Sequence, residues 1–255
     1  MLNDVDVLLL DIEGTITDIA FVHKVLFPYV RSHLRSYLSG HWSSDEVKQD
    51  LEALRVLSQS EFDSGDRKVQ LLPPDADFSS CQQKNSLLEI VIANVNHWMD
   101  LDKKVGALKQ LQGHMWRRGY ELGDLKGHLY PDVIPSLRRL LSERTGLRVF
   151  IYSSGSVLAQ KLLFTYSCEG DVTQMLSGYF DTTIGAKTEH ESYKRISESM
   201  GVDAGRILFL TDVEREAYPA KQAGYKVALV IREGNAPLTE DAKSAFALLH
   251  SLDEL

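Results

Sequence analysis

The amino-acid sequence predicts an α/β protein, with a doubly wound parallel sheet and an all-helical block inserted after the first strand. Three observations predict this fold. Short apolar runs alternate with helical patterns over residues 130–235, as in parallel strands joined by helices. A further apolar run lies near the N-terminus, at residues 5–12. Between these two regions, residues 18–128 carry helical patterns without a strand signal.

The expected strands are short, apolar and rich in leucine and β-branched residues, which is typical of strands buried on both faces. They lie at residues 5–12, 148–152, 207–210 and 227–231. Helical patterns precede or follow them at residues 135–142, 156–164, 189–200 and 214–223. The last of these helices is expected to stop at Gly224, because glycine favours the end of a helix.

The inserted block has apolar residues at helical spacing in four segments. These segments are residues 25–38, 45–57, 87–99 and 101–111. Residues 58–80 contain two prolines and several Asp and Ser residues, which indicates a loop between the two pairs of helices. We therefore expect an α/β core made of residues 1–17 and 129–255, and a helical cap domain made of residues 18–128.

The composition limits the possible partners and the cellular location. A formal net charge of −8 over 255 residues argues against nucleic acid or an anionic membrane surface as a partner. Cys81 and Cys168 have no metal-ligand neighbourhood and are expected to be ordinary thiols in a reducing compartment. The N-terminal apolar run is too short to span a bilayer. We expect a cytoplasmic monomer, and an acidic protein can still bind a small phosphorylated metabolite where a metal ion and lysines offset the charge locally.

Polar side chains follow the ends of three expected strands, where ligands collect in open parallel sheets. Asp11 and Glu13 follow the first strand, Ser153 and Ser154 the second, and Asp212 the third. Lys187 lies in a turn-rich stretch between the second and third of these positions. Each motif alone is commonly a helix cap, a turn or a surface residue. Their convergence on one rim favours a catalytic site.

These residue types suit phosphoryl transfer. The Asp11 carboxylate can attack phosphorus and form an aspartyl-phosphate that water later cleaves. Ser153 and Ser154, followed by a helix N-terminus, can donate hydrogen bonds to phosphate oxygens. Lys187 can offset the negative charge of nucleophile and phosphate. Carboxylate oxygens are also the hard ligands that Mg²⁺ prefers. Whether Glu216 is a further ligand or a helical surface residue stays open.

The order of these motifs resembles that of a known superfamily. Residues 11–15 (DIEGT), Ser153, Lys187 and residues 211–212 (TD) resemble the four motifs of the Mg²⁺-dependent haloacid dehalogenase superfamily. The helical block looks like the cap inserted in that superfamily. The first motif departs from the usual pattern, because Glu13 stands where an aspartate is common. Longer strings, such as ILFLTDVEREAYPAKQAG at 207–224, resemble the acireductone synthase family of bifunctional enolase-phosphatases of methionine salvage.

This resemblance implies a reaction in two steps. The substrate 2,3-diketo-5-methylthiopentyl-1-phosphate would be enolised and then dephosphorylated to 1,2-dihydroxy-3-keto-5-methylthiopentene. Asp11, the carbonyl or carboxylate of Glu13, and Asp212 would bind one Mg²⁺ per subunit. Ser153, Ser154 and Lys187 would bind the substrate. We expect Asp11 to be the nucleophile, Glu13 the general acid and base, and Lys187 a third catalytic residue.

Several alternatives remain at this level. The base for enolisation is either Glu13 or a cap residue such as His114. Met115 and Trp116 suit contacts with a methylthio group, but they equally suit helix packing. A different capped phosphatase or phosphomutase of the superfamily is the second candidate function. A signalling receiver domain and a plain binding module fit less well, because neither needs a capped nucleophile and metal set after the first strand.

Overall fold

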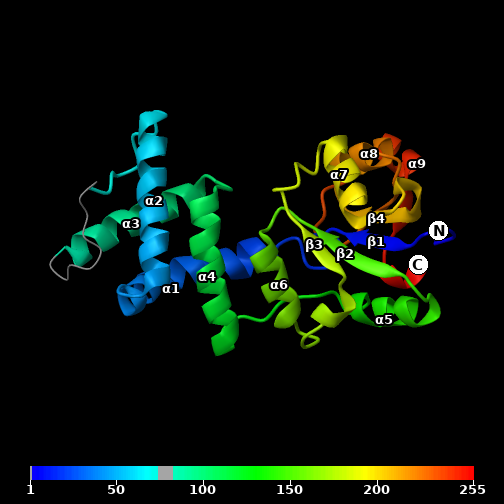
Figure 1. Ribbon diagram of the computed structural model, residues 1–255, viewed down its shortest axis with the longest axis horizontal. Helices are drawn as coiled ribbons and strands as arrows, with labels where there is room; N and C mark the ends of the chain where they lie inside the picture. The colour runs from blue at the N-terminus through cyan, green and yellow to red at the C-terminus, as the bar shows by residue number, and fades with distance from the viewer. Residues whose placement is uncertain (1, 74–82) are drawn as a thin grey trace. The chain divides into compact units, whose positions relative to one another are not determined.

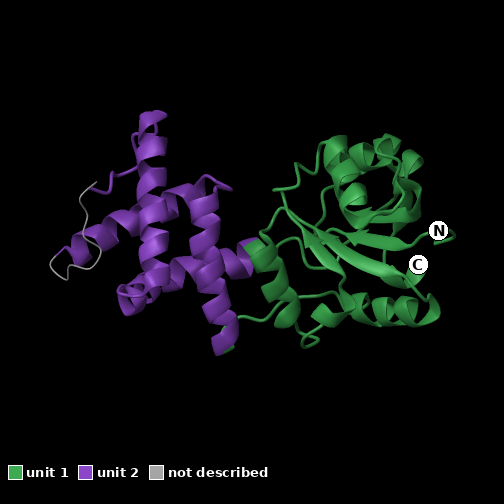
Figure 2. Ribbon diagram, in the orientation of Figure 1, with its two compact units in different colours: residues 1–22, 123–255 green, residues 23–122 purple. Residues whose placement is uncertain are grey.

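The computed structural model describes residues 2–73 and 83–255. The chain divides into two compact units, Met1–Val22 with Gly123–Leu255, and His23–Leu122 (Figure 2). This division differs at both junctions from the one expected from the sequence. Cys81 and the end of the expected loop, residues 74–80, lie outside the described residues.

The first unit contains a six-stranded sheet in which every neighbouring pair of strands is parallel. Its strands are β1 (Val7–Leu10), β2 (Arg148–Tyr152), β3 (Gly178–Phe180), β4 (Ile207–Thr211), β5 (Lys226–Val230) and β6 (Ala247–Leu249). The order across the sheet is β3-β2-β1-β4-β5-β6. All four residues of β1 have no exposed surface, as expected for a central strand covered on both faces. The predicted parallel α/β fold is confirmed.

Helices cover both faces of this sheet. Figure 1 shows α5 and α6 on one face and α7, α8 and α9 on the other. Their bounds are α5 Val133–Glu143, α6 Val157–Thr165, α7 His190–Met200, α8 Glu214–Gln222 and α9 Glu240–Ala245. Short 3₁₀ turns are η2 Thr173–Met175, η3 Ala204–Arg206 and η4 Leu252–Glu254. The edge strands β3 and β6 and the six-residue helix α9 were not predicted, because so few residues show no clear period.

The second unit consists of helices. These are α1 (Phe27–His41), α2 (Asp45–Asp63), α3 (Lys84–Asp100) and α4 (Gly106–Leu122), with a π-helical turn η1 (Val22–Leu26) before α1. Helices α1 and α2 each contact both α3 and α4. Their shared core contains large side chains with almost no exposed surface, such as Val30, Leu34, Leu51, Trp98 and Leu111.

Two sequence-based boundaries in this unit were wrong. Helix α2 continues through Asp63 into the expected loop, because the buried Ser58 keeps its last turns against the core. The fourth helix lies at Gly106–Leu122 instead of residues 101–111. Leu101 is 52% exposed and ends α3, and Asp102 then turns the chain with a positive φ of +49°, outside the helical region.

Candidate active site

Strand register brings the predicted site residues to one edge of the sheet. Strand β1 pairs with β2 on one side and β4 on the other, with Leu10 opposite Ile151 and Leu210. The chain leaves β1 at Asp11 and β4 at Thr211, and both positions are at the carboxyl ends of their strands. This is where the strand order reverses, which is the usual ligand site of an open parallel sheet.

The loop after β1 is held in a tight turn. The Asp11 amide donates to the Leu210 carbonyl at 2.9 Å, and the Gly14 amide donates to the Thr17 carbonyl at 2.8 Å. Gly14 has a φ of +72°, and a Cβ added there would lie 2.4 Å from Asp212 Oδ2. Only glycine therefore allows the Asp212 carboxylate to approach this loop so closely. Glu13 is half-buried and pairs with Thr17 across the turn.

Three charged side chains meet beside this loop. The Lys187 ammonium lies 2.6 Å from Asp11 Oδ1 and 2.6 Å from Glu216 Oε2. The side chains of Lys187 and Asp11 are 7% and 8% exposed, and that of Glu216 is 13% exposed. The Thr211 hydroxyl is 3.1 Å from a carboxylate oxygen of Asp11 and of Glu216, and can donate to one of them. We call Asp11, Lys187 and Glu216 the ion-pair cluster.

Burial and charge shift the pKa values in this region. Burial would lower the pKa of Lys187, but the carboxylates of Asp11 and Glu216 outweigh it and raise this pKa above its ordinary value. Burial, followed by the charge of Asp11, raises the pKa of Glu216. The same two causes raise the pKa of Asp212 to about 7. Lys187 therefore stays a cation, beside carboxyl groups that are harder to ionise than usual.

The residues present fit a divalent cation. Within the described part of the chain, Asp212 Oδ1 is buried and has no hydrogen-bond partner. A cation there would satisfy this oxygen and relieve the repulsion between Asp212 and Asp11. Among the described residues, no group of three or more His, Cys, Asp and Glu side chains forms a metal cage. Mg²⁺ needs none, since it keeps several waters and binds through one or two carboxylates and substrate phosphate.

The predicted phosphate-binding residues follow β2. Ser153 is 5% exposed, its amide donates to the Phe180 carbonyl, and its hydroxyl accepts from the Gly155 amide at 3.2 Å. Ser154 is half-buried. Ser156 then caps α6 by accepting from the Ala159 amide. The loop therefore leads directly into a helix N-terminus, whose amides favour an anion.

The structure adds residues that sequence reasoning left open or missed. Glu216, four residues after Asp212 on the first turn of α8, is an ion-pair partner of Lys187. The Asp-x-x-x-Glu spacing was its signal. Asn235, in the segment after β5, donates to the carbonyls of Gly14 and Val230 and so ties the loop after β1 to the sheet. No local pattern marked Asn235, because it lies outside any regular element.

The candidate cap residues lie inside α4 instead of after the last helix. His114 Nδ1 is 2.8 Å from Asp50 Oδ2, and the Asp50 side chain has no exposed surface. Met115 is 1% exposed, and Trp116, at 8%, donates from Nε1 to the Leu26 carbonyl at 3.0 Å. Both side chains are therefore core residues of their unit, as the packing alternative expected.

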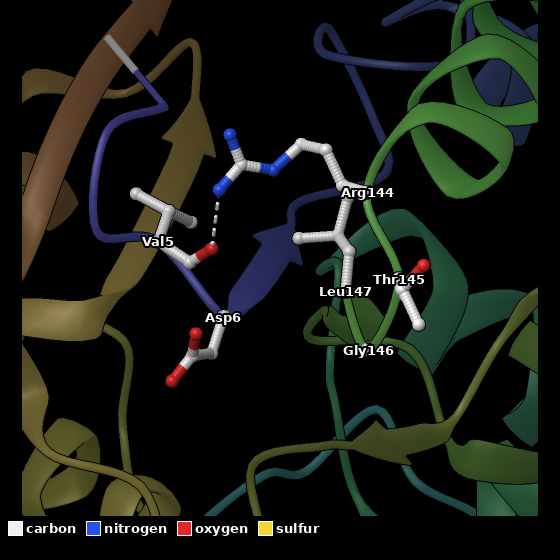
Figure 3. A pocket seen from close by; sticks show the side chains of 6 residues that line it. All are labelled: Val5, Asp6, Arg144, Thr145, Gly146 and Leu147. Carbon is white, nitrogen blue, oxygen red and sulfur yellow. Dashed lines mark hydrogen bonds between the residues drawn. The ribbon is translucent and has the colours of Figure 1, made fainter.

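A hollow of about 290 Å³ lies at the other end of β1. It is lined by Val5, Asp6, Arg144, Thr145, Gly146 and Leu147 (Figure 3). The Arg144 guanidinium donates to the Val5 carbonyl at 3.0 Å. These residues precede β1 and β2, so this hollow is separate from the ion-pair cluster at the carboxyl ends of the strands.

Comparison with protein families decides the affiliation of the chain. Residues 5–224 match the family model of haloacid dehalogenase-like hydrolases. The chain belongs to this family. It is a hydrolytic enzyme, a phosphatase. The matched range extends from the start of the sheet to the end of α8 and contains every residue of the ion-pair cluster.

Two curated relatives illustrate the similarity. Enolase-phosphatase E1 of Branchiostoma floridae is 48% identical over all of this chain and 85% of its own length. Enolase-phosphatase E1 of Salmo salar is 49% identical, over 97% of this chain and 93% of its own. The resemblance to enolase-phosphatases that the sequence strings predicted is confirmed.

Solved structures show the same fold. The UTR4 protein of Saccharomyces cerevisiae is 32% identical with a TM-score of 0.71, over 98% of this chain and all of that one. A haloacid dehalogenase-type phosphatase of Thermococcus onnurineus has a TM-score of 0.53 at 19% identity, over 97% of this chain and 94% of that one, and shows the fold alone. Among the described residues, no helix is long and apolar enough to cross a membrane.

Proposed function

We propose that this enzyme is an Mg²⁺-dependent enolase-phosphatase that acts on 2,3-diketo-5-methylthiopentyl-1-phosphate. The observation that carries this proposal is the ion-pair cluster beside the loop of Asp11 and Glu13, at the switch point of the sheet. Full-length identity of 48% to an enolase-phosphatase supports the substrate class. The proposal includes a monomer in the cytoplasm, consistent with a small-metabolite substrate.

A relative that combines two activities in one chain supports the choice of substrate. A relative from Oryza sativa subsp. indica, 44% identical over 96% of this chain, bears the name "Probable bifunctional methylthioribulose-1-phosphate dehydratase/enolase-phosphatase E1". The chain corresponds to 46% of that protein's length. Loss of water from the adjacent diol and ketone of methylthioribulose-1-phosphate gives a 2,3-diketone phosphate. The product of one activity is therefore the substrate that we propose for the other.

The phosphatase step uses Asp11 as nucleophile. An Asp11 oxygen bonds to phosphorus while the bond from phosphorus to the enol oxygen breaks, and Glu13 gives that oxygen a proton. Water, losing its proton to Glu13, then cleaves the aspartyl-phosphate and releases phosphate. Lys187, with Asp11 Oδ1 at 2.6 Å, holds the nucleophile in place and offsets its charge. Ser153 and Ser154 bind phosphate oxygens.

The enolase step comes first. A base removes a proton from C1 of the substrate, and the C2 carbonyl oxygen gains one. We assign the base to Glu13, because it lies on the same loop as the nucleophile, whereas His114 is bonded to Asp50 in the other unit. Asp11, the backbone carbonyl of Glu13 and Asp212 would hold Mg²⁺, which would supply positive charge near the phosphoryl group and the carbonyl oxygen.

The test is a substrate panel with the purified protein and Mg²⁺. The diketone phosphate should give an enol absorbance before phosphate appears, and common sugar phosphates should react far more slowly. Chelation with EDTA should stop both signals, and Asp11→Asn should lower phosphate release by at least about a thousandfold. Asp171→Asn, which changes a surface turn at Thr173, is the control and should keep full activity. Phosphate release from sugar phosphates without any enol signal would instead identify a general phosphatase of the family.

A further inference from the structure

Tyr193 lies directly behind the ion-pair cluster. It is on α7 and has no exposed surface. Its hydroxyl donates to the Lys187 carbonyl at 2.7 Å and lies 3.2 Å from the Glu216 carbonyl. One side chain therefore contacts the backbone of both residues whose charged groups face each other in the cluster.

The Tyr193 ring also supports the walls around the ammonium group. It packs against Tyr152 edge-on, with centroids 5.6 Å apart, and against Phe209 at 5.4 Å. The Lys187 ammonium lies 5.7 Å from the Tyr152 ring and 5.9 Å from the Phe209 ring, within range of cation–π attraction. Tyr193 thus touches the two aromatic rings that flank this cation as well as its backbone.

The hydroxyl of Tyr193 is a permanent donor. Burial, with the negative charges of Glu216 and Asp11, raises its pKa above the ordinary value for tyrosine. It therefore stays protonated at neutral pH. Removing it would leave the buried Lys187 carbonyl without this donor, and an unsatisfied buried carbonyl tends to shift toward another partner.

We propose that Tyr193 is a positioning residue for phosphoryl transfer. Its hydroxyl fixes the backbone of Lys187 relative to that of Glu216, so that one ammonium meets the carboxylates of Asp11 and Glu216 together. The proposal rests on the proposed function, in which Lys187 acts on the phosphoryl group. Tyr193 reaches no substrate atom in this role, since it acts through the placement of Lys187.

The chain offers a matched control in Tyr225. It is also buried, at 4% exposed, and its hydroxyl donates to a backbone carbonyl at 2.7 Å, that of Tyr193. Its ring meets the Tyr193 ring edge-on at 5.6 Å. Tyr225→Phe therefore removes a comparable buried hydrogen bond in the same aromatic cluster, one step further from Lys187.

The experiment compares Tyr193→Phe with Tyr225→Phe in the full-length protein with Mg²⁺. Tyr193→Phe should lower kcat about three- to tenfold, the effect of one misplaced hydrogen bond, and change KM less. Tyr225→Phe should stay within about twofold of the wild type in both constants. The two melting temperatures should fall by similar amounts. A third variant, with 4-aminophenylalanine in place of Tyr193, restores a donor and should recover most of kcat.

A second measurement needs no substrate. The ¹H–¹⁵N resonance of the Lys187 ammonium should shift or broaden in Tyr193→Phe and stay unchanged in Tyr225→Phe. Equal kcat values for the two variants, or an unchanged Lys187 resonance in Tyr193→Phe, would overturn the proposal. If the wild type hydrolyses only another phosphate ester, the proposed function fails, and the same comparison is made with that ester. If Tyr193→Phe does not fold, the 4-aminophenylalanine variant tests the proposal through its Lys187 resonance. A resonance that differs from that of the wild type would contradict the role of the donor.

Discussion

The Asp11 carboxylate and the Lys187 ammonium lie 2.6 Å apart, and each side chain is less than one-tenth exposed. The Asp11 oxygen that faces Lys187 also accepts from the Ile12 amide at 2.8 Å. A buried carboxylate held by an ammonium and an amide has a fixed direction and a compensated charge. Both properties suit the nucleophile that we propose Asp11 to be.

The first prediction concerns Lys187. Lys187→Met should lower the free energy of unfolding by about 3–5 kcal/mol, because it leaves the buried carboxylates of Asp11 and Glu216 without their cation. It should also abolish phosphate release. Urea unfolding and a phosphate assay measure the two effects. Lys126→Met, at an exposed position of the same unit, should change neither. Unchanged stability of Lys187→Met would contradict the burial argument.

The second prediction concerns the length of the Glu13 side chain. Glu13→Asp restores the residue that the wider superfamily commonly has, but withdraws the carboxylate by one methylene. Release of phosphate from a simple phosphate ester should continue, because an aspartate can still serve as acid and base there. Enol formation from the diketone phosphate should slow at least about tenfold. Equal losses in both steps would mean that Glu13 has no separate part in enolisation.

The third prediction concerns Gly14. A Cβ at this position would lie 2.4 Å from Asp212 Oδ2 and 2.9 Å from Asn235 Oδ1, and the backbone has a φ of +72°. Gly14→Ala should therefore displace Asp212, weaken Mg²⁺ binding measured by calorimetry, and lower stability by more than about 1 kcal/mol. Gly201→Ala separates backbone strain from the clash with Asp212, since Gly201 has a φ of +63° but open space around it. It should lose stability but keep Mg²⁺ affinity.

The fourth prediction concerns His114 and pH. The hydrogen bond to Asp50 raises the pKa of His114 above its ordinary 6.5, against the opposing effect of burial. Asp50 and Glu46 face the ring from α2, and Arg117 lies one turn along α4. A raised histidine pKa stabilises the folded state fully below pH 6.5, and this contribution is lost as pH rises through the folded-state pKa.

Unfolding measurements at two pH values test the His114 linkage. The difference in the free energy of unfolding between wild type and His114→Asn should be larger at pH 5.5 than at pH 9, because the stabilisation by protonated His114 is lost as the pH rises. His33→Asn is the control, because the His33 ring bonds within α1, to the Tyr29 carbonyl and the Ser32 hydroxyl. A difference that grows with rising pH would show that His114 is held as the neutral ring.

Much of the fold could be predicted because patterns among residues close together in the sequence encode its main strands and helices. Strands β1, β2, β4 and β5 are continuous apolar runs, and their helices have clear periods or end signals. The errors fell where local signals are weak or compete. The three-residue strands β3 and β6 take their strand geometry from pairing with β2 and β5, which no local pattern encodes. The apolar Leu101 was expected to begin the fourth helix, but it is exposed at the end of α3, and α4 begins at Gly106.

The sequence by itself determined the family, the parallel sheet, and the strand ends that carry Asp11, Ser153 and Asp212, because each follows a local apolar run. Only the tertiary structure decided which side chains meet. Lys187 bonds to Asp11 and Glu216 at once, and Tyr193 holds the backbone of Lys187. Such contacts join residues from different elements, and their distances follow from how β4, α7 and α8 pack. Hydrophobic periodicity predicts the structure of one segment at a time, whereas a buried charged side chain needs a partner from a different segment of the chain.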